Sequence, residues 1–225
     1  MKIFIKRTNR KKTISIEIKD NKVEVKAPYI ISQKEIESFI LQKKDWIDKK
    51  ISFHNSIKKP IKRKFTEEEN FQFLGKDLKL KIIKSNKRKN YLDGKFIYIF
   101  IKNEEEKLKE KIKKELEILF KYEALKIFER KTNFYARKIG VYPKKITIKS
   151  YKKRWGSCSY KEELSYNWKL IMAPEKIIDY VIIHELCHLI HFNHSKDYWE
   201  KVSKILPNYK TSKEWLKINQ YLLIW

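Results

Sequence analysis

The sequence predicts an α+β protein, with a core that combines a mixed sheet and helices and a smaller N-terminal lobe rich in strands. Several short runs alternate apolar and polar residues, which is typical of half-buried strands. Longer segments repeat apolar residues at intervals of three and four, which is typical of amphipathic helices. The two kinds of segment follow one another without a regular β-α-β alternation, and this order favours α+β.

The N-terminal lobe is expected to span residues 1–65. A helix should follow its strands over residues 32–51, because Ser32 and Glu35 have the spacing of a capping box. After it, residues 54–64 are predicted to be a basic connector. The strands of this lobe are predicted at 2–7, 12–19 and 22–28, with a hairpin turn at 19–22.

The second domain, residues 66–225, is expected to open with strands and to continue with a long helix. Asn103, followed by three Glu, has the pattern of an N-cap for that helix. Gly140 suits its C-terminal end. The strands before it are predicted as a hairpin at 71–85 that turns at Gly75-Lys76 and a further strand at 95–101.

The last third of the chain contains shorter elements with recognisable helix starts. Pro174 suits the first turn of a helix, and Ser195 is a typical N-cap. Thr211 with Glu214 has a further capping pattern. We predict a strand at 144–150, a loop or irregular strand pair at 151–164, a strand at 165–173, and helices at 174–191, 195–206 and 211–223.

The charge of the chain is strongly positive, at +26, from 54 Lys plus Arg against 28 Asp plus Glu. One interpretation is a surface that binds nucleic acid or another polyanion. We favour a compositional bias, because only seven of the basic residues are Arg, the residue preferred for bidentate phosphate contacts. Weak, non-specific polyanion binding is then expected as a side effect.

The two cysteines, Cys158 and Cys187, form no C-x-x-C pair, so we expect buried free thiols and no cysteine zinc cage. The N-terminus has no apolar run long enough for a signal peptide. No stretch approaches the ~20 apolar residues that a membrane span needs. We therefore expect a cytoplasmic protein with no membrane partner.

Four of the five histidines lie within residues 184–194. His184 and His188 are four residues apart on a predicted helix, so both imidazoles lie on one face. Glu185 lies next to the first of them, where its carboxylate can reach a water on a metal ion. This H-E-x-x-H pattern combines two zinc ligands with a general base, and we predict one Zn²⁺ ion.

A catalytic zinc site usually has three protein ligands, and three residues are candidates for the third. His191 is near His188 but lies too far along the helix to close a tetrahedral shell. Glu200 is on the following helix. We favour His194, because Asn193 before it tolerates the left-handed conformation that a turn back towards the helix needs.

The segments "RWGSCS" and "SYNWKLIMAPEKIIDYVIIHELCHLIHFNHSKDYW" resemble the YgjP-like family of zincin metallopeptidases. The N-terminal "RKKTISIEI", "VEVKAP" and "KKDWIDKK" also resemble the start of that family, so the resemblance covers nearly the whole chain. It implies a zincin-like core with an active-site helix, of the SprT-like or minigluzincin-like kind. It also implies His184, His188 and His194 as zinc ligands and Glu185 as the catalytic residue.

Three further residues are candidates for supporting roles. Arg154 could stabilise an oxyanion or bind a substrate carboxylate or phosphate; alternatively, it holds its loop through backbone carbonyls. Asn167 could orient a zinc-bound histidine through its second nitrogen, or it is a polar residue of a strand. Tyr198 could donate to an oxyanion, although packing is the interpretation we favour.

The predicted function is a zinc-dependent metallopeptidase that hydrolyses peptide bonds with a metal-activated water. A metal-dependent nucleoside triphosphate pyrophosphatase or hydrolase is the first alternative. A nucleic-acid-associated, SprT-like protease is the second. The expected partner is a peptide or protein substrate.

Overall fold

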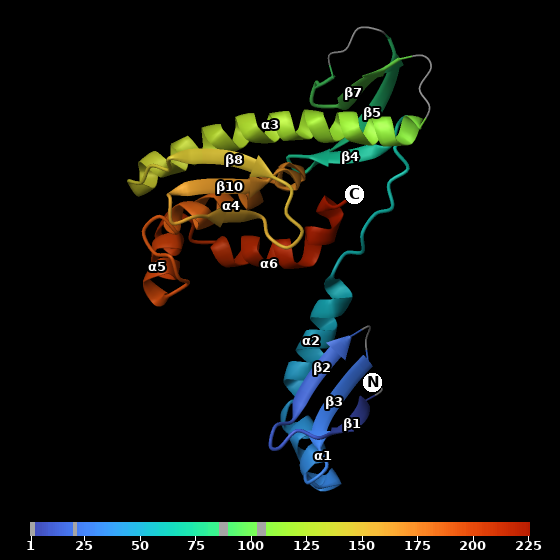
Figure 1. The fold of residues 1–225 in the computed structure, drawn as a ribbon, viewed down its shortest axis with the longest axis vertical. Coiled ribbons are helices and arrows are strands. Elements are labelled where there is room, and N and C mark those ends of the chain that lie inside the picture. Colours follow the sequence, from blue (N-terminus) through green and yellow to red (C-terminus); the bar gives the residue numbers. More distant parts are fainter. Residues whose placement is uncertain (1–2, 20–21, 86–89, 103–106) are drawn as a thin grey trace. The chain divides into compact units, whose positions relative to one another are not determined.

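The computed structural model describes residues 3–19, 22–85, 90–102 and 107–225. It divides the chain into two compact units, Met1–Lys58 (unit 1) and Lys59–Trp225 (unit 2), coloured blue to cyan and cyan to red in Figure 1. Each unit combines helices with a mixed sheet, which confirms the α+β prediction. Among the described residues, no helix is both long enough and apolar enough to cross a membrane.

Unit 1 is built on a three-stranded sheet of β1 (Ile3–Thr8), β2 (Ser15–Lys19) and β3 (Lys22–Pro28). The middle strand, β3, pairs parallel with β1 and antiparallel with β2. The predicted turn between β2 and β3 includes residues 20 and 21, which lie outside the described residues. The buried core of unit 1 consists of Val23, Val25, Ala27, Ile36 and Ile47.

Two helices, α1 (Gln33–Gln42) and α2 (Lys44–Ser56), follow the sheet. The predicted capping box is confirmed: the Glu35 amide donates to the Ser32 hydroxyl, and the Ser32 amide donates to the Glu35 carboxylate. The prediction of one continuous helix is wrong, because Lys43 leaves the helical conformation (φ −96°, ψ 5°) between the two. The helix α2 also continues into the segment predicted as a connector.

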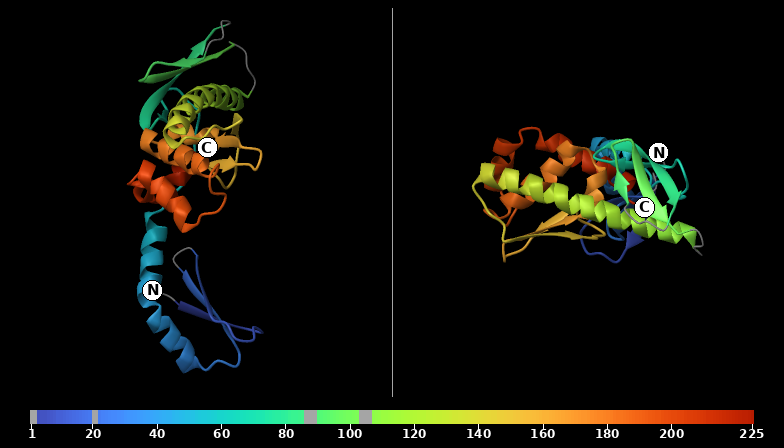
Figure 2. Two further views of the ribbon diagram at one scale, coloured as in Figure 1. Left: turned by 90° about the vertical axis from the view of Figure 1, so that its left-hand side faces the viewer. Right: turned by 90° about the horizontal axis from the view of Figure 1, so that it is seen from above.

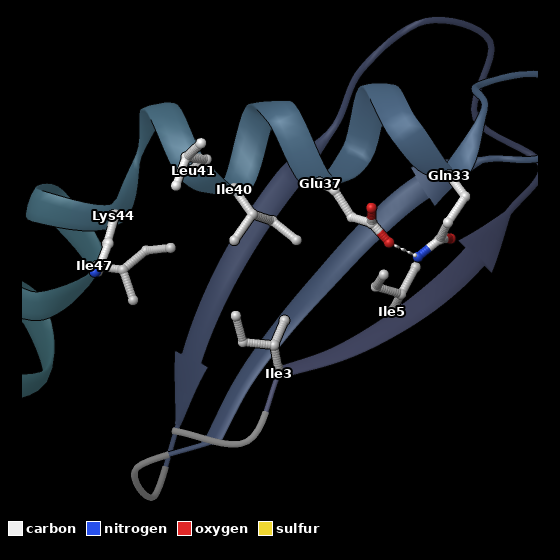
Figure 3. A pocket seen from close by; sticks show the side chains of 8 residues that line it. All are labelled: Ile3, Ile5, Gln33, Glu37, Ile40, Leu41, Lys44 and Ile47. Atoms are coloured by element: carbon white, nitrogen blue, oxygen red, sulfur yellow. Dashed lines mark hydrogen bonds between the residues drawn. The ribbon is translucent and has the colours of Figure 1, made fainter.

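A groove of about 440 Å³ opens between β1 and α1 within unit 1 (Figure 3). Its walls are largely apolar, and its polar rim includes a hydrogen bond from the Gln33 amide to the Glu37 carboxylate (2.9 Å). The lining residues are Ile3, Ile5, Gln33, Glu37, Ile40, Leu41, Lys44 and Ile47.

Unit 2 begins with a four-stranded sheet in the order β4-β5-β7-β6. The predicted hairpin is present, but its turn is at Leu74 and Gly75, which both have positive φ, one residue earlier than expected. Gly75 packs closely on Pro174, since a Cβ there would lie 2.8 Å from the Pro174 Cα. The strands are β4 (Asn70–Phe73), β5 (Lys76–Lys84), β6 (Tyr91–Leu92) and β7 (Phe96–Ile101).

The long helix α3 (Leu108–Ile139) runs along unit 2 and ends, as predicted, at Gly140 in the left-handed conformation (φ 81°). The predicted N-cap, Asn103, lies outside the described residues. The helix packs beside α4 (Glu175–Cys187), the helix that carries the histidine motif. Lys131 of α3 forms an ion pair with Asp179 of α4 (2.8 Å).

A second sheet of unit 2 contains β8 (Lys145–Lys149), β9 (Gly156–Cys158) and β10 (Glu163–Asn167). The middle strand, β10, pairs parallel with β8 and antiparallel with β9. The predicted strand at 165–173 is wrong after Asn167, where the 3-10 helix η1 (Trp168–Met172) begins. The Asn167 side chain accepts a hydrogen bond from the Lys169 amide (3.3 Å) and so caps this turn.

The C-terminal part of unit 2 is helical, and α4 packs against both α3 and α6 (Figure 2). Ser195 caps α5 as predicted, accepting from the Tyr198 amide (3.4 Å). The last helix begins at Tyr209 after Asn208, so the predicted start at Thr211 is wrong. The elements are α4 (Glu175–Cys187), α5 (Lys196–Ile205), α6 (Tyr209–Asn219) and the 3-10 helix η2 (Gln220–Leu223).

Candidate metal centre

The helix α4 is largely buried and holds the first histidine and its neighbouring glutamate. Its apolar residues before the motif, among them Ile182 and Ile183, are completely buried in the core of unit 2. The predicted helix to residue 191 is too long: α4 ends at Cys187, and His188 is its C-cap. His188 still has helical dihedrals (φ −68°, ψ −18°), so the one-turn spacing from His184 is kept.

Three imidazoles meet at the end of this helix. The nitrogen atoms that His184, His188 and His194 offer all lie within 4.8 Å of one another. The Nε2 atoms of His184 and His194 are 3.2 Å apart. The ring centroids of the three histidines are separated by 4.9, 5.0 and 4.8 Å. The structure therefore brings together the three histidines that the sequence singles out.

The loop between α4 and α5 returns His194 to the helix. Asn193 does not have the left-handed conformation predicted for it; instead its side chain accepts a hydrogen bond from the Ser195 amide (3.3 Å). The carbonyl of His191 faces Nδ1 of His188 at 3.0 Å. An acceptor at Nδ1 keeps the proton there and leaves the Nε2 lone pair of His188 available. His191 thus contributes its backbone, and its side chain is not part of the cluster.

Aromatic side chains of α5 hold the imidazoles in place. Tyr198 is fully buried, stacks on His188 (centroids 4.6 Å apart) and donates a hydrogen bond from its hydroxyl to the His184 carbonyl (2.9 Å). Trp199 stacks on His194 (centroids 5.4 Å apart, planes at 19°). Packing is the role favoured for Tyr198 over donation to an oxyanion, and its hydroxyl hydrogen is donated to a backbone carbonyl.

The electrostatics of the cluster favour neutral imidazoles. Burial lowers the pKa of His184 to about 3, and it also lowers the pKa values of His188 and His194. Neutral imidazole is the form that binds zinc. Three uncharged nitrogen ligands with convergent lone pairs therefore fit a divalent metal ion such as zinc.

Glu185 lies on the buried side of the same helix end, with only 6% of its surface exposed. Burial raises its pKa to about 8, and the positive charge of Arg154 opposes that rise. The carboxylate packs on the backbone of Gly156: a Cβ at this glycine would lie 2.5 Å from Oε1 of Glu185. No local sequence pattern predicts this contact, since it joins residues 29 positions apart.

The other candidates have different partners. Asn167 donates to the carbonyls of Tyr151 (3.0 Å) and Arg154 (3.2 Å), so it holds that loop and does not orient a histidine. Arg154 is exposed, with its guanidinium near the Ser157 hydroxyl (3.5 Å) and over the Tyr151 ring. Glu200 is exposed and pairs with Lys204 (2.8 Å), outside the histidine cluster.

Three clustered histidines beside one buried glutamate are typical of metal-dependent hydrolases. The chain belongs to the YgjP-like family: the family model described as "YgjP-like, metallopeptidase domain" matches residues 12–219. Membership of this family implies a bound metal ion.

Two solved structures resemble parts of the chain. The metallopeptidase zymogen abylysin of Pyrococcus abyssi is 22% identical, with a TM-score of 0.37, over 39% of this chain and 89% of that one. The zymogen jannalysin of Methanocaldococcus jannaschii is 23% identical, with a TM-score of 0.36, over 40% of this chain and 92% of that one. No curated protein matches the chain.

Proposed function

We propose that the protein is a zinc-dependent peptidase in which His184, His188 and His194 hold the ion and Glu185 is the general acid–base. The observation that carries this proposal is the meeting of three neutral imidazoles beside one buried carboxylate. When bound, zinc supplies Lewis acidity and brings the pKa of water to about 7.

The role of Glu185 follows from its environment. A general base works best when its pKa lies near the working pH, and burial raises the pKa of this carboxyl to about 8. Glu185 can therefore take a proton from the attacking water and return it to the leaving amine nitrogen. The carboxylate lies so close to Gly156 that no Cβ would fit at that position.

The sheet beside the site supports a peptide as substrate. The strand β9 lies at one edge of its sheet, and in the described part of the chain only β10 pairs with it. Unpaired amide and carbonyl groups at a sheet edge can bind an extended peptide as an additional strand. Because β9 begins at Gly156, such a peptide would lie beside Glu185.

Nucleoside triphosphate hydrolysis is the second candidate, since Lys152, Lys153 and Arg154 precede β9 and could bind phosphate groups. A substrate screen separates the two functions, with peptides and nucleoside triphosphates offered to wild type and to Glu185→Gln. We expect peptide cleavage by wild type and a loss of about 10²–10⁴-fold in the variant. Phosphate release lost in Glu185→Gln, without peptide cleavage, would favour the nucleotide function.

Metal analysis of protein purified without a His-tag tests the ligands. We expect about one zinc per chain in wild type and in Glu185→Gln, and much less in His194→Ala. Glu200→Gln is the matched control, since this exposed carboxylate lies outside the cluster, and it should keep both metal and activity. Unchanged zinc content in His194→Ala would refute the ligand assignment.

A further inference from the structure

The loop that precedes β9 is held by hydrogen bonds from two buried residues. Asn167, only 3% exposed, donates to two carbonyls of this loop, those of Tyr151 and Arg154. The indole of the buried Trp168 donates to the Ser150 hydroxyl (3.0 Å). Residues 150–154 therefore have a defined backbone, although three successive side chains of the loop are cationic.

These cations line a pocket of about 340 Å³, which we call the basic pocket. Lys152, Lys153 and Arg154 come from the loop, and Lys169 comes from η1. No acidic residue is among the described residues that line it, and none of these four cations forms an ion pair within the described part of the chain. Trp155 and Ile224 add apolar surface to the wall.

Lys169 is the most enclosed of the four cations. Burial lowers its pKa, so its charge is incompletely compensated by protein groups. The carboxylate that acts on it electrostatically is Glu117 of α3, and Glu117 forms its own ion pair with Lys121 (2.7 Å). An anion in the basic pocket would supply the missing counter-charge.

The basic pocket lies next to the proposed active site along the chain. Arg154, which lines it, is two residues before Gly156, and Gly156 contacts Glu185. Two residues of chain span at most ~7 Å, so the backbone of Arg154 lies within about that distance of Gly156. That distance corresponds to two or three residues of an extended peptide.

We propose that the basic pocket binds an acidic side chain of the peptide substrate, two or three residues from the cleaved bond. This proposal rests on the proposed peptidase function and adds a preference for acidic peptides. A compact pocket with four cations suits one carboxylate, whereas single-stranded nucleic acid needs an elongated basic groove with stacking aromatics.

Two peptides that differ only in Glu or Gln at that position provide the test. We expect wild type to cleave the Glu peptide with a kcat/KM higher by on the order of tenfold. The double variant Lys153→Gln/Lys169→Gln should lose most of this preference while still cleaving the Gln peptide. The double variant Lys109→Gln/Lys126→Gln replaces two exposed residues of α3 outside the pocket; it controls for net charge and should keep the preference.

Binding measured by fluorescence anisotropy in the Glu185→Gln background separates this proposal from the catalytic one. Tighter binding of the Glu peptide, lost when the two lysines are also replaced, supports the basic pocket even if wild type cleaves neither peptide. Equal binding of both peptides overturns it, even if wild type cleaves both. The proposal is also overturned if replacing Lys153 and Lys169 weakens the binding of a labelled single-stranded oligonucleotide but leaves the binding of the Glu peptide unchanged.

Discussion

The three-stranded sheet of unit 1 and the second sheet of unit 2 have the same plan but different interiors. In each, the last strand in sequence lies in the middle, parallel to the first strand and antiparallel to the second. The middle strand of unit 1 buries only apolar side chains, whereas β10 also buries Ser165 and Asn167. Among the described residues, every buried polar side chain belongs to unit 2.

This difference shows that the strand arrangement alone does not create a functional site. Burial of polar groups costs free energy unless they are paired, so a protein keeps them where they have a role. In unit 2, Asn167 fixes the loop before β9, and three histidines meet near Glu185 at the end of α4. Unit 1 offers an apolar core and a mostly apolar groove.

The largest expected effect tests whether the two cores are independent. Ile36→Ala in unit 1 and Ile183→Ala in unit 2 each truncate a fully buried side chain, which should cost about 2–5 kcal/mol of stability. Hydrogen exchange should show lost protection only in the unit that carries the substitution. Equal loss of protection in both units would show that they unfold together.

The pH dependence of stability should also distinguish the units. In metal-free protein, the folded-state pKa of Glu185 is raised from 4.5 to about 8. Between these two pH values the folded chain binds more protons than the unfolded chain. The protonated carboxyl of Glu185 therefore contributes its full stabilisation below pH 4.5, and this stabilisation is lost as the pH rises through 8. The free energy of unfolding of Glu185→Gln, relative to that of wild type, should therefore rise by on the order of a few kcal/mol between pH 4.5 and 9.

Denaturant unfolding at several pH values, with a chelator present, measures this gain. Unit 1 should show no corresponding change in hydrogen exchange, because its described residues bury no ionisable side chain. A stability difference between wild type and Glu185→Gln that is constant with pH would contradict the assigned environment of Glu185.

The edge strand β9 should tolerate substitution poorly at Gly156, where it meets the Glu185 carboxylate. Gly156→Ala places a Cβ against the Glu185 carboxylate, and we expect peptide cleavage to fall about a hundredfold with zinc retained. Gly94→Ala is the control, since nothing lies within 4 Å of its Cβ position; its positive φ should affect stability and leave activity unchanged. Full activity in Gly156→Ala would mean that the carboxylate has room to move.

The smallest effect concerns the support of the histidines. Tyr198→Phe removes the hydrogen bond to the His184 carbonyl but keeps the stacking on His188, so we expect a loss of about 1 kcal/mol in stability. Zinc affinity, measured by competition with a chelator, should fall several-fold. Tyr209→Phe, which keeps its stacking on Trp199, should match wild type.

Much of the fold could be predicted from local patterns. The strands of unit 1, the capping box at Ser32, the N-cap at Ser195 and the end of α3 at Gly140 depend on residues close in sequence. The histidine pattern is equally local, because one helical turn separates His184 from His188. The prediction failed after Asn167, where the side chain of this residue caps a 3-10 helix in a segment predicted as a continued strand.

The sequence by itself determined the α+β class, the histidine spacing and the residue types suited to zinc. Only the tertiary structure decided that His194 joins the cluster while Glu200 pairs with Lys204. It also decided that Asn167 supports a basic loop, and that Gly156 leaves space for Glu185. The physical reason is that these contacts join separate elements, and packing between elements follows no short-range sequence period.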